Sequence, residues 1–161
     1  LGGHLLFCAL YAVLHYWHLG VVGYYAGGMD QGAYLASRLD DYEMIRYVNR
    51  NVAKHDGVYL VFTGNRFFLY DVRVRSQYFS ADPILTALGR DASVEELFLD
   101  LASLRCRYFV FHMPRTRRVL DGLSVLQRRV WEEFVEQHLR LVKIIGSYAL
   151  FELMESDQVQ E

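Results

Sequence analysis

Arginine side chains are the strongest candidates for binding chemistry in this sequence, and they occur in three groups. The candidate residues are Asn65 and Arg66 in a Gly64-Asn65-Arg66 turn, Arg73 and Arg75 in a weak strand pattern, and Arg115, Arg117 and Arg118 after a later strand. A guanidinium group is planar and donates paired hydrogen bonds to carboxylates and phosphates. These residue types therefore predict binding of an anionic group, and they do not predict bond cleavage.

Each arginine group also has a purely structural interpretation, which the sequence leaves open. The Gly64–Arg66 turn follows a strand, where open α/β sheets usually bind ligands, but it lacks the spacing of a glycine-rich phosphate loop. Arg73 and Arg75 would face the same side of a strand, either lining a groove for an anion or protecting a sheet edge with charge. The cluster at residues 114–118 would either meet anionic membrane head groups or form a solvated loop.

Residues suited to catalysis or metal binding are present but are not arranged for either. The serines and histidines show no order typical of a nucleophilic triad. Cys8 and Cys106 are distant in the chain and match no metal or redox spacing. His15 and His18 lie one helical turn apart, as metal ligands can, but a position near a membrane surface explains them as well. We predict no catalytic residue, no metal ligand and no cofactor in this chain.

Charge is distributed very unevenly along the sequence. Residues 1–29 contain no Asp, Glu, Lys or Arg, so all 36 formal charges lie from Asp30 onward. A bilayer-spanning helix needs roughly 20 mainly apolar residues, because a charge near its centre costs about 2.5–3.5 kcal/mol. Aromatic residues between Tyr16 and Tyr25 follow the most apolar stretch, and Trp and Tyr collect where hydrocarbon meets head groups. We therefore expect residues 1–29 to be a transmembrane-helix fragment with its membrane-interface segment.

Other interpretations of this charge-free segment differ in how well the sequence fits them. A secretory signal peptide would show a positively charged start and a small-residue cleavage site, and neither is visible. A buried core helix stays open, because the cleanest apolar run, Leu5–Leu14, is only ten residues long. The chain would then be a flavodoxin-like ligand binder without a membrane segment. The net charge of −2 predicts no general attraction to nucleic acid.

Beyond Asp30 the hydrophobic pattern alternates between helical and strand periods. We predict helices over 40–52, 93–104 and 123–138, strands over 58–62, 73–79 and 107–111, and a hairpin of 139–145 with 148–153. Residues 67–70 extend the first strand pattern, and Leu126, Val130 and Phe134 are predicted to face inward. This order predicts an α/β fold: a small Rossmann-like three-layer domain over residues 30–154 with a C-terminal antiparallel hairpin, then a polar tail at 155–161.

The order of these features resembles a known group of membrane enzymes. An aromatic-rich apolar helix leads into Gly28-Met29-Asp30-Gln31 and Tyr34–Leu39, and Tyr42–Asn49 follows. The strand 58–62 with Gly64-Asn65-Arg66, the segment Ser93–Leu97 and the strand 107–111 complete the pattern. Together they resemble the C-terminal end of bacterial integral-membrane glycosyltransferases of the C-type fold, above all the protein-mannosyltransferase-like and lipid A aminoarabinose-transferase-like enzymes.

The resemblance implies a function for the whole enzyme and a role for this part of it. Such enzymes take a sugar from a polyprenyl-phosphate carrier and give it to a protein, lipid or polysaccharide on the extracytoplasmic side of the inner membrane. Their essential acidic residues, usually with a divalent metal ion, lie in loops between early membrane helices, and no residue here matches those loops. The implied role is an accessory domain whose partners are membrane lipid, the upstream membrane domain and, through it, donor and acceptor. A membrane-anchored, non-catalytic binding or assembly module is the alternative.

Overall fold

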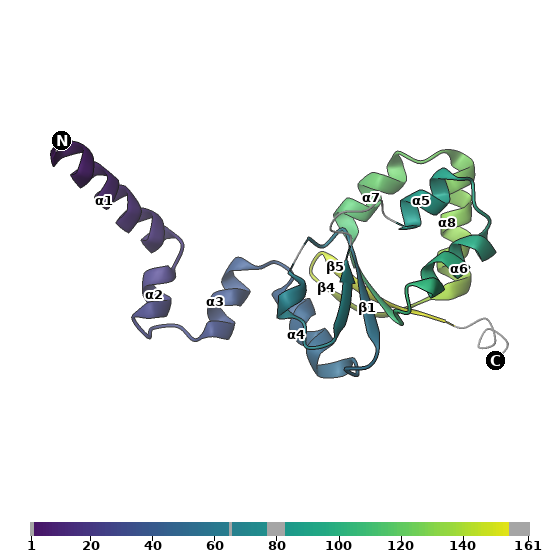
Figure 1. Cartoon of the computed structure of the whole chain (residues 1–161), viewed down its shortest axis with the longest axis horizontal. Helices are drawn as coiled ribbons and strands as arrows, with labels where there is room; N and C mark the ends of the chain where they lie inside the picture. The colour runs from purple at the N-terminus through teal and green to yellow at the C-terminus, as the bar shows by residue number, and fades with distance from the viewer. Residues whose placement is uncertain (1, 65, 77–82, 155–161) are drawn as a thin grey trace. The chain divides into compact units, whose positions relative to one another are not determined.

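The computed structural model describes residues 2–64, 66–76 and 83–154 (Figure 1). The chain divides into two compact units, Leu1–Tyr42 and Glu43–Glu161, which we describe separately. Asn65, the end of the predicted strand at 77–79 and the polar tail at 155–161 lie outside the described residues.

The first unit contains three helices, α1 (Gly2–His18), α2 (Val21–Tyr25) and α3 (Gln31–Arg38). Gly20, with φ +64°, separates α1 from α2 because this left-handed conformation suits glycine and ends a helix. Asp30 begins α3 by accepting a hydrogen bond from the Ala33 N–H at 3.0 Å. Within the described residues, no helix is both long and apolar enough to cross a membrane.

Two contacts connect α3 to the helices before it. The Arg38 guanidinium donates a hydrogen bond to the His18 carbonyl at 2.8 Å, at the end of α1. The rings of Tyr24 and Tyr34 stack with their centroids 5.1 Å apart. The first charged residues of the chain therefore fold back against the end of the charge-free segment.

The second unit begins with α4 (Tyr42–Asn51) and is built on a five-stranded sheet. Its strands are β1 (Gly57–Val61), β2 (Arg73–Ser76), β3 (Tyr108–His112), β4 (Leu139–Ile145) and β5 (Tyr148–Leu153). The order across the sheet is β2-β1-β3-β5-β4. β1 runs parallel to β2 and β3, whereas β5 runs antiparallel to β3 and β4. The predicted central strands and C-terminal hairpin are thus confirmed.

Helices cover both faces of this sheet, because alternate strand residues point to opposite sides. On one face, Met44, Ile45 and Val48 of α4 share a buried cluster with strand residues such as Val58 and Val110. On the other face, Tyr59, Val61, Phe109 and Phe111 share a buried cluster with three helices. These helices are α5 (Pro83–Gly89), α6 (Val94–Ser103) and α8 (Val125–His138). The predicted three-layer α/β architecture is confirmed.

Helix starts explain where the local predictions succeed. Ser93 begins α6 with both hydrogen bonds of a capping box, since its hydroxyl accepts from the Glu96 N–H and the Glu96 carboxylate accepts from the Ser93 N–H. Ser124 and Gln127 repeat this arrangement at the start of α8. The helix predicted from Asp40 begins slightly later, at Tyr42.

Two predictions, for residues 114–118 and for residues 67–70, are wrong. Residues 114–118 are not a loop but belong to α7 (Met113–Asp121), where Pro114 occupies the first turn and His112 caps the helix through its ring. Proline is tolerated there because its missing N–H would have no helical partner. The proposed strand extension over 67–70 is also wrong, because Phe67–Leu69 forms a short 3-10 helix, η1.

A third correction concerns α8, where Leu126 was predicted to face inward with Val130 and Phe134. Phe134 is fully buried and Val130 is half-buried, but Leu126 lies in the first turn and is 60% exposed. Trp131, which was not predicted to face inward, is buried instead. The helix start at Val125 places Leu126 before the helix reaches the core.

Candidate functional site

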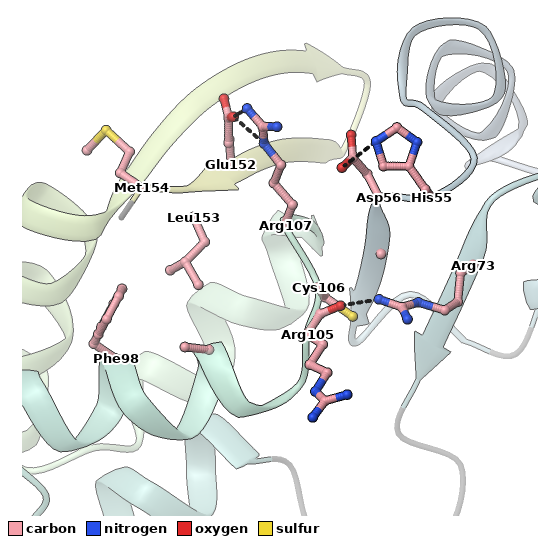
Figure 2. A pocket seen from close by; sticks show the side chains of 12 residues that line it. His55, Asp56, Arg73, Phe98, Arg105, Cys106, Arg107, Glu152, Leu153 and Met154 are labelled. Atoms are coloured by element: carbon pink, nitrogen blue, oxygen red, sulfur yellow. Dashed lines mark hydrogen bonds and ion pairs between the residues drawn. The ribbon is translucent and has the colours of Figure 1, made fainter. Parts of the chain in front are cut away.

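A cavity of about 370 Å³ lies at the amino ends of the parallel strands (Figure 2). Its polar lining comes from His55, Asp56, Arg73, Arg105, Arg107 and Glu152. Its apolar lining comes mainly from Phe98 and Ala102 of α6 and from Leu153 and Met154 at the end of β5. The size is typical of sites for small ligands, and polar and charged side chains from several elements converge on it, so we take this cavity as the candidate site.

One end of the cavity is shaped by close packing between Gly57 and Arg105. Arg105 follows α6 with φ +51°, a left-handed conformation often found just beyond a helix end. Its carbonyl accepts a hydrogen bond from the Arg73 guanidinium at 2.5 Å. A β-carbon on Gly57 would lie 2.6 Å from the same carbonyl oxygen. Because Gly57 has no side chain, the start of β1 can pack against Arg105 after α6 and against the Arg73 side chain of β2.

The other end of the cavity carries an ion-pair cluster around Glu152 of β5. Arg107 donates to Glu152 Oε1 through Nε at 2.8 Å and Nη2 at 2.6 Å. Arg140 of β4 donates to Oε2 through Nε at 3.2 Å and also through Nη2. The Glu152 side chain is only 7% exposed, whereas those of Arg107 and Arg140 are 55% and 65% exposed. A buried carboxylate thus fixes two solvent-facing guanidinium groups.

These contacts determine the protonation of Glu152. Burial raises the pKa of Glu152, but hydrogen bonds from Arg140 and Arg107 outweigh it and hold the pKa below its ordinary value of 4.5. The same hydrogen bonds and the charge of Glu152 raise the pKa of Arg107. Glu152 is therefore ionised at neutral pH and acts as an anchor for the arginines, since a general acid would need a raised pKa.

We expect Glu152→Gln to lower the free energy of unfolding at pH 7 by about 1–3 kcal/mol, because charge-assisted hydrogen bonds are lost while the exposed arginines stay hydrated. Because the folded-state pKa of Glu152 is lowered, its stabilisation is present above pH 4.5 and is lost as pH falls through the folded-state value. Urea denaturation at pH 7 and pH 3 should show a smaller difference in unfolding free energy between variant and parent at pH 3. An equal gap at both pH values would contradict this role, and exposed Glu136 serves as a control in Glu136→Gln.

Cys106 borders the cavity but is not arranged as a nucleophile. Its side chain is buried, and burial raises the pKa of the thiol although Arg75 and Arg73 lower it in part. A raised pKa keeps the thiol protonated at neutral pH, and the thiolate is the reactive form. Among the residues that the structure describes, no group of three or more His, Cys, Asp or Glu side chains could hold a metal ion. The Cys106 thiol is therefore a buried part of the cavity wall.

The arginines singled out in the sequence lie in different places. Arg73 lines the cavity, and Arg75 lies two residues further along β2, opposite Tyr59 of β1. Arg66 comes just before η1 and takes part in a contact of its own, while Asn65 is outside the described residues. No ligand contact has been observed for any of them, so their binding roles stay predictions.

The basic cluster after β3 does not act as one patch. Arg115 donates through Nη1 to the Phe62 carbonyl at 3.3 Å, which ties α7 to the end of β1. Arg117 lines a separate hollow of about 370 Å³ between α7 and α8 together with Trp131. Arg118 is exposed to solvent. On the helix over 113–121, Arg117 is turned away from Arg115, whereas Arg115 and Arg118 are three residues apart and lie on the same side.

The sequence did not identify three residues of the candidate site, namely Arg105, Arg107 and Glu152. One signal could have identified Glu152: it is the only charge within the otherwise apolar strand Tyr148–Leu153. A carboxylate that points to a buried sheet face needs cationic partners. No comparable local signal exists for Arg105, because its importance comes from the helix end on which it lies.

No family model matches the chain, and no curated protein matches it. Among solved structures, the chain is similar to the C-terminal globular domain of an oligosaccharyltransferase from Archaeoglobus fulgidus, with 18% sequence identity and a TM-score of 0.47. The match covers 71% of this chain and 97% of that domain. A likeness at this level does not assign a function by itself.

Proposed function

We propose that this chain is a membrane-tethered accessory domain of a glycosyltransferase that moves a sugar from a polyprenyl-phosphate donor to a protein, lipid or polysaccharide. The observation that carries the membrane part is the exposure of α1. Successive helix residues point about 100° apart, and Leu5, Leu6 and Phe7 are 66%, 73% and 67% exposed. Apolar side chains thus face outward on every side of α1, whereas a helix made for water has a polar face.

The end of α1 supports the same proposal. Tyr16 and Trp17 are exposed in its last turn, where amphipathic rings suit the boundary between hydrocarbon and head groups. Arg38 then brings a positive charge to the carbonyl end of the helix through the His18 carbonyl, which complements the helix dipole. An apolar helix, aromatic rings and a cation follow one another in the order expected on leaving a membrane.

The glycosyltransferase part of the proposal is carried by the resemblance in sequence order. The cavity of the α/β domain supplies binding groups without a nucleophile or a metal cluster among the described residues. An accessory role fits this chemistry, with the acidic catalytic residues and any divalent metal supplied by a membrane domain elsewhere in the enzyme. By the same resemblance, we place the α/β domain on the extracytoplasmic side of the inner membrane.

A membrane-anchored binding or assembly module is the second candidate, and the cavity favours it because binding alone needs no partner transferase. The two functions differ in what the rest of the gene product contains. The transferase proposal requires several membrane spans with acidic residues in an outer loop, whereas the binding module requires neither.

The whole gene product in membranes is expected to transfer sugar from a polyprenyl-phosphate donor, whereas purified residues 30–161 should show no transfer. Removal of residues 43–161 from the gene product should lower transfer at least tenfold, because the accessory domain would no longer assist the membrane domain. Sugar transfer by each of these proteins can be measured with a radiolabelled sugar donor and scintillation counting of the acceptor. Transfer by residues 30–161 alone, or full transfer without the domain, would exclude the accessory role. Absence of membrane spans from the rest of the product would favour the binding module.

A further inference from the structure

The cavity at the amino ends of the strands has two chemically different ends (Figure 2). Arg73 and Arg105 lie at one end, on either side of Cys106, and the side chains of Phe98 and Leu153 lie at the other. The lining thus runs from a cationic end to an apolar end, and the Arg107–Glu152 and His55–Asp56 pairs border it as well. A ligand that fills it would match both ends only if it carried an anionic group and an apolar part.

The arginines at the cationic end differ from those around Glu152 in their ion pairing. Within the described residues, neither Arg73 nor Arg105 forms an ion pair with a carboxylate, whereas Glu152 pairs with Arg107 and Arg140. The Arg73 guanidinium donates a hydrogen bond to the Arg105 carbonyl through Nη2. A guanidinium has about five N–H donors, so this one bond does not use the full donor capacity of Arg73.

The backbone fixes this end before any ligand arrives. The left-handed conformation of Arg105 and its contact with Gly57 set the position of the carbonyl that holds Arg73. A side chain that is already positioned loses less conformational entropy on binding. Asp56 also borders the cavity, but it contacts His55 at 3.7 Å rather than either arginine.

We propose that this cavity binds an amphiphile, with an oxyanion head at Arg73 and Arg105 and an apolar chain along Ala102, Phe98 and Leu153. Carboxylate and phosphate are the oxyanions that planar guanidinium groups match, and both share this chemistry. A volume of about 370 Å³ accommodates such a head group with a short chain. The proposal needs neither a membrane anchor nor a sugar-transfer partner, so it stands apart from the proposed function.

The test is a titration of the full chain in neutral detergent with hexyl phosphate, hexanoate, hexanol and inorganic phosphate. Amide signals of Gly57 and Ala102 in NMR spectra report on the two ends of the cavity. We expect hexyl phosphate or hexanoate to shift both signals, inorganic phosphate to bind at least tenfold more weakly, and hexanol to leave Gly57 unshifted. Whichever hexyl anion binds more tightly identifies the head group.

Arg105→Asn is the main variant, because asparagine tolerates a left-handed backbone and so removes the guanidinium with little strain. It should weaken hexyl-anion binding at least tenfold, and Arg73→Gln should do the same where thermal unfolding shows that it folds. Arg129→Gln, an exposed position on α8, removes the same charge and should change nothing. Binding of hexanol as tight as that of the anions, unaltered affinity in Arg105→Asn, or shifts confined to α1 would overturn the proposal. None of these outcomes bears on membrane attachment or sugar transfer.

Discussion

Deletion of residues 1–29 is expected to reduce binding of the chain to lipid vesicles by more than about a hundredfold, because burial of even two leucine-sized side chains contributes about 3–6 kcal/mol. The same deletion should leave the thermal unfolding of the α/β domain unchanged. Neither buried cluster of that domain includes a residue of α1 or α2. Asp30, which caps α3, is retained.

Vesicle flotation measures the first effect and circular dichroism measures the second. Leu6→Ser and Leu10→Ser together provide a matched full-length variant, since both side chains are exposed on α1 and contribute to neither core cluster. This double variant should bind vesicles more weakly and unfold at the same temperature. If the deletion instead abolished folding, residues 1–29 would be a core helix, and the membrane proposal would fail.

Gly57→Ala is expected to lower the free energy of unfolding by about 1–3 kcal/mol or more, the usual range for overpacking. The new β-carbon would lie 2.6 Å from the Arg105 carbonyl oxygen and 3.0 Å from Arg73 Nη2. The Arg73 side chain can move away, but the Arg105 oxygen belongs to the backbone and is held by its left-handed conformation. Relief therefore requires movement of β1 or of the end of α6.

Gly89→Ala is the matched control for this substitution. Gly89 ends α5, and no atom of the described residues lies within 4 Å of a β-carbon built there. Alanine should be neutral at this position or stabilise the helix by up to about 1 kcal/mol. Urea denaturation of both variants would compare them directly. Equal effects of Gly57→Ala and Gly89→Ala would show that the contact with Arg105 does not constrain the domain.

Local patterns predicted those parts of the fold in which a few neighbouring residues decide the structure. The apolar runs that become β1 and β3, the capping box at Ser93 and the Gly146-Ser147 hairpin are all of this kind. Residues 114–118 were predicted as a loop, yet Pro114 is compatible with a helix, because proline breaks a helix interior but favours a helix start. The helix start is marked by the His112 cap, and the position of His112 depends on the folded end of β3.

The candidate site was less predictable because distant segments form it. Asp56, Arg105 and Glu152 come from three parts of the chain that only the sheet order brings together. Arg73 and Arg75 were recognised by their alternation, but the acceptor of Arg73 is a backbone carbonyl, which has no sequence signal. The sequence therefore indicated Arg73 and Arg75, but it indicated neither Arg105 and Arg107 nor which arginines share a cavity.

The sheet order also has a consequence for synthesis of the protein. β5 follows β4 in the sequence, yet it lies between β3 and β4 and pairs with both. Until residues 148–153 have left the ribosome, β3 has one neighbour, and the hydrogen-bonding groups on its other side have no strand partner. An unpaired strand edge is a template for association with other chains. The sheet is therefore complete only once residues 148–153 have emerged, and a chain that stops before Tyr148 would leave one edge of β3 unpaired and open to aggregation.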